Sequence, residues 1–110
     1  MLLPNGNQAV VDIAKLREYC INTNHPFGKF KARVFASALG LAADDAPLLA
    51  TWLLHAPQVE ETQLGRTDVY GQRYIVDFYA THLGRTSRIR SCWIILAMEN
   101  FPRLVTCYVL

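Results

Sequence analysis

The chain has 110 residues, of which 52% are hydrophobic and 18% charged, and its formal net charge is +2. A chain of this length forms one domain, and its apolar content builds a core, so a disordered protein is excluded. No apolar run reaches the roughly 20 residues that cross a bilayer, and we expect no membrane partner. The mild net charge neither requires nor excludes a nucleic-acid partner.

The start of the chain and its cysteines indicate a cytoplasmic protein. Residues 1–6 contain no basic region and too short an apolar stretch for a signal peptide. Cys20, Cys92 and Cys107 are odd in number and widely spaced, so neither a disulfide framework nor a zinc site is predicted. We therefore expect reduced, buried thiols, no metal and no cofactor.

Two of the three predicted helices have boundaries marked by capping residues and prolines. The first begins at an Asp12 cap and runs to position 21, after which residues 22–26 end it. The third begins at Asp44 or Asp45 and tolerates Pro47 in its first turn. It is expected to end near Pro57, because a helix does not usually continue through a proline.

The second helix, predicted over residues 27–39, carries a lysine on its apolar face. Apolar residues recur there with the helical period of about 3.6, and they are Phe27, Phe30, Val34, Phe35 and Ala38. Lys31 falls in the middle of this face, whereas Lys29 and Arg33 fall opposite. An ammonium aimed at a core is unfavourable unless it is paired or a cleft opens there. Lys31 therefore either reaches solvent or points into a site. Gly40 ends the helix as a left-handed C-cap.

The second half of the chain changes to the alternating pattern of strands. Strands are predicted over residues 59–67, 70–81, 86–97 and 103–110. Their short connections imply an antiparallel meander. The predicted fold class is α+β, with about three N-terminal helices packed on a C-terminal antiparallel sheet of about four strands, in one domain over residues 1–110. Asp77 is expected to pair with Arg73 or Arg90 across strands.

Positive charge is concentrated in two segments. Residues 15–33 contain five lysines and arginines against Glu18 alone, and residues 85–90 contain Arg85, Arg88 and Arg90 without an acid. If the segments meet in space, they form a patch suited to a phosphate backbone. The alternative is that they are ordinary solvated faces.

Side chains suited to catalysis occur near the Lys31 helix and on the last predicted strand. His25 lies directly before that helix. Thr106 and Tyr108 are two positions apart, so their hydroxyls project from the same face of the last strand.

This order of features resembles the barnase–EndoU–colicin–RelE superfamily of small, metal-independent ribonucleases, many of which are bacterial toxin domains. Its EndoU-like toxin members build their site from a histidine, a lysine and a Thr-x-Tyr on the last strand. The resemblance implies catalytic roles for His25, Lys31, Thr106 and Tyr108. One departure is that EndoU-type sites use two histidines, and neither His55 nor His82 is evidently placed to join His25.

The sequence is also similar, over nearly the whole chain, to an uncharacterised bacterial domain family. The similar segments are residues 25–35 (HPxGxxKARVF), 70–78 (YGQRYIVDF) and 101–110 (FPRLVTCYVL). This similarity supports the domain boundaries and brings no activity with it.

As a ribonuclease, the chain would use a neutral His25 to take the proton of a ribose 2′-hydroxyl that attacks the adjacent phosphate. Lys31 would stabilise the charge that develops on the phosphorane oxygens. Thr106 would donate a hydrogen bond to a nonbridging oxygen, and Tyr108 would stack on or position a base. Flanking phosphates would be held by Arg88 and Arg90.

These residues could instead have purely structural roles. His25 could simply brace its loop, and Lys31 could run along the edge of the core to solvent. The rival function is a non-catalytic protein-binding or regulatory domain with an exposed strand edge. The partners expected under the two functions are RNA, a cognate antitoxin or another protein, and a second copy of the chain in a homodimer.

Overall fold

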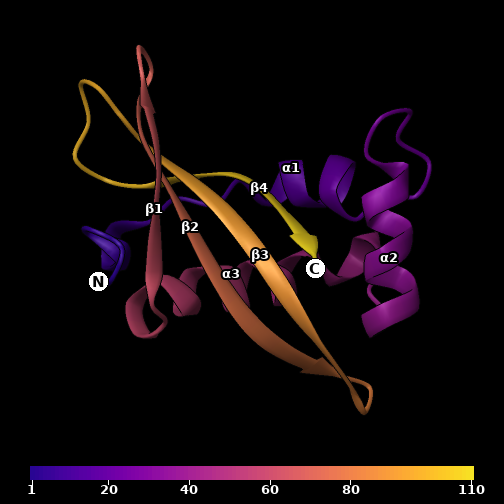
Figure 1. Cartoon of the computed structure of the whole chain (residues 1–110). Coiled ribbons are helices and arrows are strands. Elements are labelled where there is room, and N and C mark those ends of the chain that lie inside the picture. Colours follow the sequence, from indigo (N-terminus) through magenta and orange to yellow (C-terminus); the bar gives the residue numbers. More distant parts are fainter.

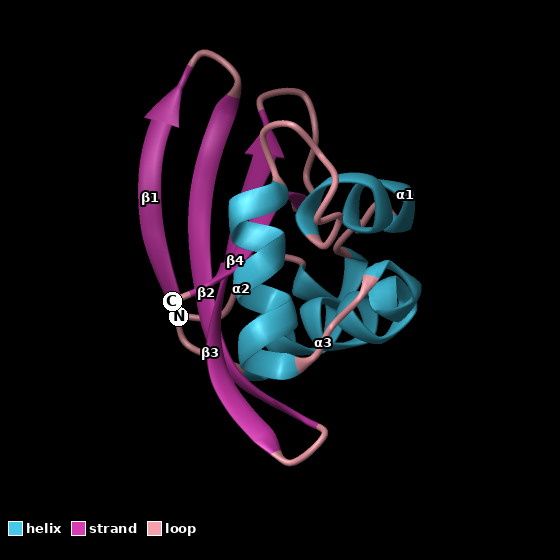
Figure 2. Ribbon diagram, turned by 90° about the vertical axis from the view of Figure 1, so that its right-hand side faces the viewer, coloured by secondary structure: helices cyan, strands magenta, loops and turns pink.

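Helices and strands occupy separate halves of the chain and separate layers of the molecule (Figure 2). The computed structural model describes residues 1–110. Its helical layer contains α1 (Ile13–Lys15), the π-helical turn η2 (Leu16–Cys20), α2 (Lys29–Leu39) and α3 (Ala46–Val59). Its sheet contains β1 (Thr62–Asp68), β2 (Gly71–His82), β3 (Arg85–Leu96) and β4 (Arg103–Val109). The predicted α+β class, with three helices on a four-stranded antiparallel meander, is confirmed.

The strands follow one another in the order β1-β2-β3-β4, and every neighbouring pair is antiparallel (Figure 1). Side chains of paired residues project from the same face. Ser91 lies opposite Val76 and Cys107, and all three are buried beneath the helices. Arg90 lies opposite Asp77 and Tyr108. The Tyr108 side chain therefore lies on the face of the sheet that the helices leave open.

The core fills the space between α2, α3 and the covered face of β2, β3 and β4. Its largest wholly buried side chain, Trp93, donates its indole N–H to the Ser91 hydroxyl at 2.8 Å. That hydroxyl donates in turn to the Val76 carbonyl at 2.6 Å. Both polar side chains are thus satisfied inside the core, where an unpaired group would be destabilising.

The buried side of α2 differs from the predicted apolar face. Ala32, Phe35 and Leu39 are fully buried, whereas Phe27 is 82% and Phe30 64% exposed. Apolar residues form two stripes along α2, and both include Phe35. The sheet packs against the stripe that also contains Ala32 and Leu39, whereas Phe30 and Val34 of the other stripe stay exposed. Lys31 consequently lies at the margin of the buried side rather than in its middle.

The helix that was expected to stop near Pro57 continues through it to Val59. Pro57 lies in the last turn, so its missing N–H removes only the bond to the Leu53 carbonyl. Its ring is buried, with Gly6 packed closely against it. Because α3 extends further than predicted, β1 starts at Thr62 instead of position 59.

Several local predictions are confirmed. Asp12 caps α1 by accepting from the backbone N–H groups of Ala14 at 3.0 Å and Lys15 at 3.4 Å. Gly40 ends α2 with a left-handed φ of 66°. The first helix is shorter than predicted, since regular α geometry ends at Lys15 and η2 continues it to Cys20.

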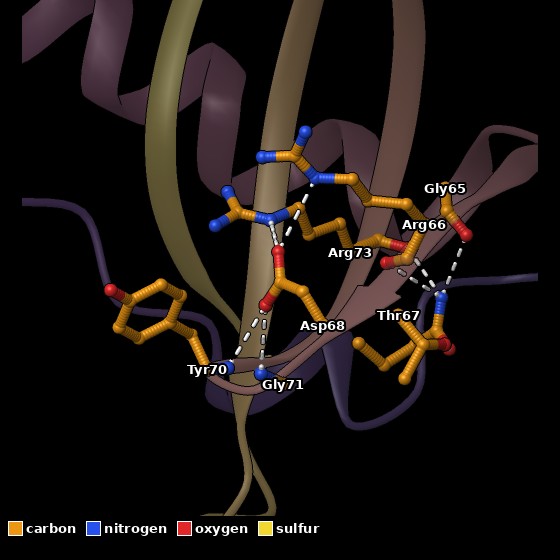
Figure 3. A network of polar contacts seen from close by, with 8 residues as sticks. Gly65, Arg66, Thr67, Asp68, Tyr70, Gly71 and Arg73 are labelled. Carbon is orange, nitrogen blue, oxygen red and sulfur yellow. Dashed lines mark hydrogen bonds and ion pairs between the residues drawn. The ribbon is translucent and has the colours of Figure 1, made fainter.

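The β1–β2 hairpin is closed by Asp68 (Figure 3). One carboxylate oxygen accepts from the backbone N–H groups of Tyr70 at 2.9 Å and Gly71 at 3.3 Å. The other lies 2.9 Å from Arg73 Nε and 3.3 Å from Arg66 Nε. The bond from Arg73 is the main cause of a lowered pKa of Asp68.

No single helix of the chain is long and apolar enough to cross a membrane. Only α2 taken together with residues 43–59 reaches that length and composition, and the two segments are bent by 78° at their junction.

Candidate functional site

Lys31 reaches around the edge strand β4 to the open face of the sheet. α2 packs beside the end of β4 (Figure 1). The Lys31 ammonium nevertheless lies 4.4 Å from the centroid of the Tyr108 ring, and Lys31 forms no ion pair with a carboxylate. A cation over an aromatic face contributes about 0.5–1 kcal/mol at an exposed site. Lys31 is therefore placed at a polar surface with its charge available.

A groove of about 410 Å³ opens at the outer edge of β4. Its lining residues are Lys15, Tyr19, Lys31, Val105 and Thr106. The Lys15 ammonium donates to the Val105 carbonyl, which fixes one cation at the wall of the groove. Two lysines and a threonine thus line one opening, a set of residues suited to an anion such as a phosphate group.

His25 braces the turn that leads into α2. Its Nδ1 accepts from the backbone N–H groups of Phe27 at 3.0 Å and Gly28 at 2.9 Å. A neutral ring that accepts at Nδ1 carries its proton on Nε2. The ring packs edge-on against Tyr19, with centroids 4.5 Å apart. His25 therefore adjoins the groove through Tyr19 and is not one of its lining residues.

Gly28 allows the helix to approach η2 closely. A Cβ at this position would lie 2.6 Å from the Tyr19 carbonyl oxygen, which is well inside contact distance. Close packing of α2 against η2 therefore requires a glycine at this position of the HPxGxxK segment. Together with the His25 brace, it fixes where α2 starts and how Lys31 faces β4.

Arg88 and Arg90, the two predicted phosphate-binding residues, differ in how strongly they are held by Asp77. Arg90 pairs with Asp77 through two bonds of 2.9 Å, as the sequence predicted, and the Asp77 side chain is only 5% exposed. This bond raises the pKa of Arg90, and Tyr108 contributes further. Arg88 is half exposed and lies 3.6 Å from Asp77. Arg88 is thus the freer of the two to meet a phosphate.

Two thiols lie buried beneath this edge of the sheet. Cys20 on η2 and Cys107 on β4 are both free and buried, and Cys92 is half-buried. A hydrogen bond with Cys107 lowers the pKa of Cys20 to about 7, and the charge of Lys15 adds to the effect. The same bond, together with burial, raises the pKa of Cys107. The Lys15 ammonium therefore acts on the core as well as on the groove.

The structure brings Lys31, Thr106 and Tyr108 together and leaves His25 one side chain away. The sequence does not indicate that Lys15 and Tyr19 line the groove. Lys15 belongs to the basic segment of residues 15–33, and Tyr19 lies within the first predicted helix. Neither signal indicates contact with a strand some 90 positions later. No group of three or more His, Cys, Asp or Glu side chains is close enough to hold a metal ion.

The chain belongs to the family described as Domain of unknown function (DUF6883), whose model matches residues 2–110. No curated protein matches the chain. The family match covers the α+β domain from end to end, and it carries no link to ribonuclease toxins.

Proposed function

We propose that this member of the family is a metal-independent ribonuclease, and that the groove beside β4 is its active site. The observation that supports the proposal is the position of Lys31, which lines the groove together with Thr106 and whose ammonium also lies over the Tyr108 ring beside it. Phosphoryl chemistry on RNA needs these groups, because charge develops on the phosphorane oxygens and the substrate must be oriented.

In the proposed reaction the ribose 2′-hydroxyl gives its proton to His25 or to water, and its oxygen bonds to the adjacent phosphorus. The 5′-oxygen leaves and takes a proton from water, giving a 2′,3′-cyclic phosphate and a free 5′-hydroxyl. Lys31 and Thr106 hold the nonbridging oxygens, and Lys31 binds them more tightly as their charge grows. Tyr108 positions a neighbouring base, and Arg88 holds a flanking phosphate.

His25 has two alternative roles in this scheme. In the conformation described above it is a positioning residue, because its Nδ1 holds the turn that starts α2 and thereby orients Lys31. As a general base it would take the 2′-proton, since imidazole titrates near neutral pH. That role requires Nδ1 to give up the N–H groups of Phe27 and Gly28.

The proposal extends to a toxin-type protein that acts on cytoplasmic RNA and is restrained by a cognate antitoxin. The groove is shallow and lies at a sheet edge, so a partner that covers β4 and the start of α2 would block it. The supporting features are the exposed Lys31 and the open volume beside Thr106.

The test is cleavage of mixed cellular RNA by the purified protein in EDTA, beside Lys31→Met and a matched control, Arg17→Met. Arg17 is an exposed, unpaired cation on η2 that does not line the groove. We expect wild type and Arg17→Met to cleave, and Lys31→Met to lose about 10²–10³-fold while it stays folded. Absence of cleavage by wild type at high protein concentration and several pH values refutes the proposal. Unfolding of Lys31→Met would show instead that this lysine is structural.

A second candidate function, a protein-binding module, is favoured by a different observation. β1 pairs with β2 only as far as Val76, so residues 77–82 present a strand edge without a β1 partner. A cavity of about 290 Å³, which Trp52, His55 and Phe78 help to line, adjoins this edge. An extended segment of another protein could add there as a strand. Failure of RNA cleavage would favour this protein-binding function over the ribonuclease.

A further inference from the structure

We infer that the exposed side of α2 is a stacking platform for the bases of single-stranded RNA, with Phe30 as its centre. This inference rests on the proposed function, because it names unpaired RNA as the substrate class of the same site. The platform consists of the aromatic side chains of Phe27 and Phe30 with the cations Lys29, Lys31 and Arg33.

The two phenylalanines are far more exposed than a packed core allows. Phe27 is 82% and Phe30 is 64% exposed, and Val34 on the same stripe is 43% exposed. Phe30 and Val34 are four positions apart in α2 and lie on one side of the helix, and Phe27 lies in the turn directly before it. The helix therefore presents an apolar stripe to solvent in addition to the one that it buries.

Positive charge surrounds the exposed ring of Phe30. The Lys29 ammonium lies 5.2 Å and the Arg33 guanidinium carbon 5.7 Å from the Phe30 centroid. Lys29, Lys31 and Arg33 form no ion pair. The ion pairs of the chain involve other cations. An aromatic surface with uncompensated cations complements a strand that alternates bases with phosphates.

The platform is continuous with the proposed active site. Lys31 follows Phe30 directly in α2, and its ammonium reaches the Tyr108 ring. A phosphate held at Lys31 would bring the next nucleotide over the exposed aromatic rings. Bases are free to stack there only when they are unpaired, since a duplex encloses their faces.

Charge placement and packing favour RNA over a lipid surface. A helix that lies on a membrane buries one broad apolar face in it. Here the broad apolar face of α2, with Ala32, Phe35 and Leu39, is buried in the protein core instead. The exposed stripe is narrow and carries its cations directly over the Phe30 ring, where they would hinder insertion into hydrocarbon.

The experiment measures binding separately from cleavage. A fluorescent 2′-O-methyl oligonucleotide of about ten nucleotides, within the usual site sizes of single-strand binders, cannot be cleaved because its 2′-oxygens are blocked. Its affinity is measured by anisotropy, alone and annealed to its complement, for wild type, Phe30→Ala, Phe30→Trp and the control Leu64→Ala. Leu64 is as exposed as Phe30, at 66%, but lies on β1 at the opposite edge of the sheet.

We expect Phe30→Ala to weaken single-strand binding about tenfold, in the range found for loss of one stacking ring. Phe30→Trp should restore the affinity, Leu64→Ala should leave it unchanged, and the duplex should bind more weakly and without dependence on Phe30. Equal binding by wild type and Phe30→Ala, or equal losses for single strand and duplex, overturns the inference. Binding to phosphatidylserine vesicles, but not to the oligonucleotide, with the same dependence on Phe30 also overturns it.

The outcomes for the two proposals are distinguishable. If the protein cleaves no RNA but binds the oligonucleotide in a Phe30-dependent way, the proposed ribonuclease activity is refuted and the stacking platform is supported. Cleavage that needs Lys31, with single-strand binding that is indifferent to Phe30, would keep the ribonuclease and refute the platform.

Discussion

Two substitutions of His25 separate its bond to the backbone from its ability to titrate. His25→Ala removes both, whereas His25→Asn removes only the titration. An asparagine oxygen can accept the N–H groups two and three positions ahead, as Asx turns do. Asp12 and Asp68 already make such bonds in this chain. The asparagine variant should therefore keep the turn that starts α2.

The expected loss of stability follows from the contacts of the ring. Gly28 is buried, so its N–H would be left without a partner in His25→Ala, which costs about 1–3 kcal/mol. Loss of the edge contact with Tyr19 adds about 0.5–1.5 kcal/mol. With an unfolding entropy of about 2.1 cal/mol/K per residue, the total of about 1.5–4.5 kcal/mol lowers the Tm by about 6–20 °C. His25→Asn loses only the ring contact, and its Tm should fall by about 2–6 °C.

The assays are thermal unfolding at pH 7 and the pH dependence of RNA cleavage for both variants. If His25 is a positioning residue, His25→Asn retains most of the activity and the wild-type pH profile. If it is the general base, folded His25→Asn loses about 10²–10⁴-fold and the acidic limb of the profile. A His25→Asn variant as unstable as His25→Ala would refute the bracing of the turn by Nδ1.

Two further substitutions test the packing of the helices and the closure of the hairpin. Gly28→Ala should destabilise the protein by about 1–3 kcal/mol, since its Cβ would lie 2.6 Å from the Tyr19 carbonyl; an unchanged midpoint in urea would contradict this close approach. Asp68→Asn should lower the Tm at pH 7 but not at low pH. Because Arg73 chiefly lowers the pKa of folded Asp68, ionised Asp68 stabilises the fold above about pH 4, and this stabilisation is lost as the pH falls through the lowered pKa. Melting curves between pH 2 and 7 that differ by a constant Tm would contradict the linkage.

Local sequence patterns were sufficient to predict the fold class and most element boundaries. β2, β3 and β4 lie within one residue of their predicted limits, because alternation and turn residues are local properties of the chain. The Asp12 cap and the left-handed Gly40 are local in the same sense. The cross-strand partner of Asp77 was narrowed to two arginines, and the strand register selected Arg90.

The buried side of α2 and the contacts of Lys31 depend on how the helix packs on the sheet. The helix carries two apolar stripes, and its own sequence does not distinguish the one that packs from the one that stays exposed. The sheet makes that choice, because α2 lies over the edge strand β4 and buries the side with Ala32 and Leu39. Lys31 is thereby turned toward Tyr108. A contact between segments so far apart in sequence depends on layer packing and sheet register, which leave no periodic signal in either segment.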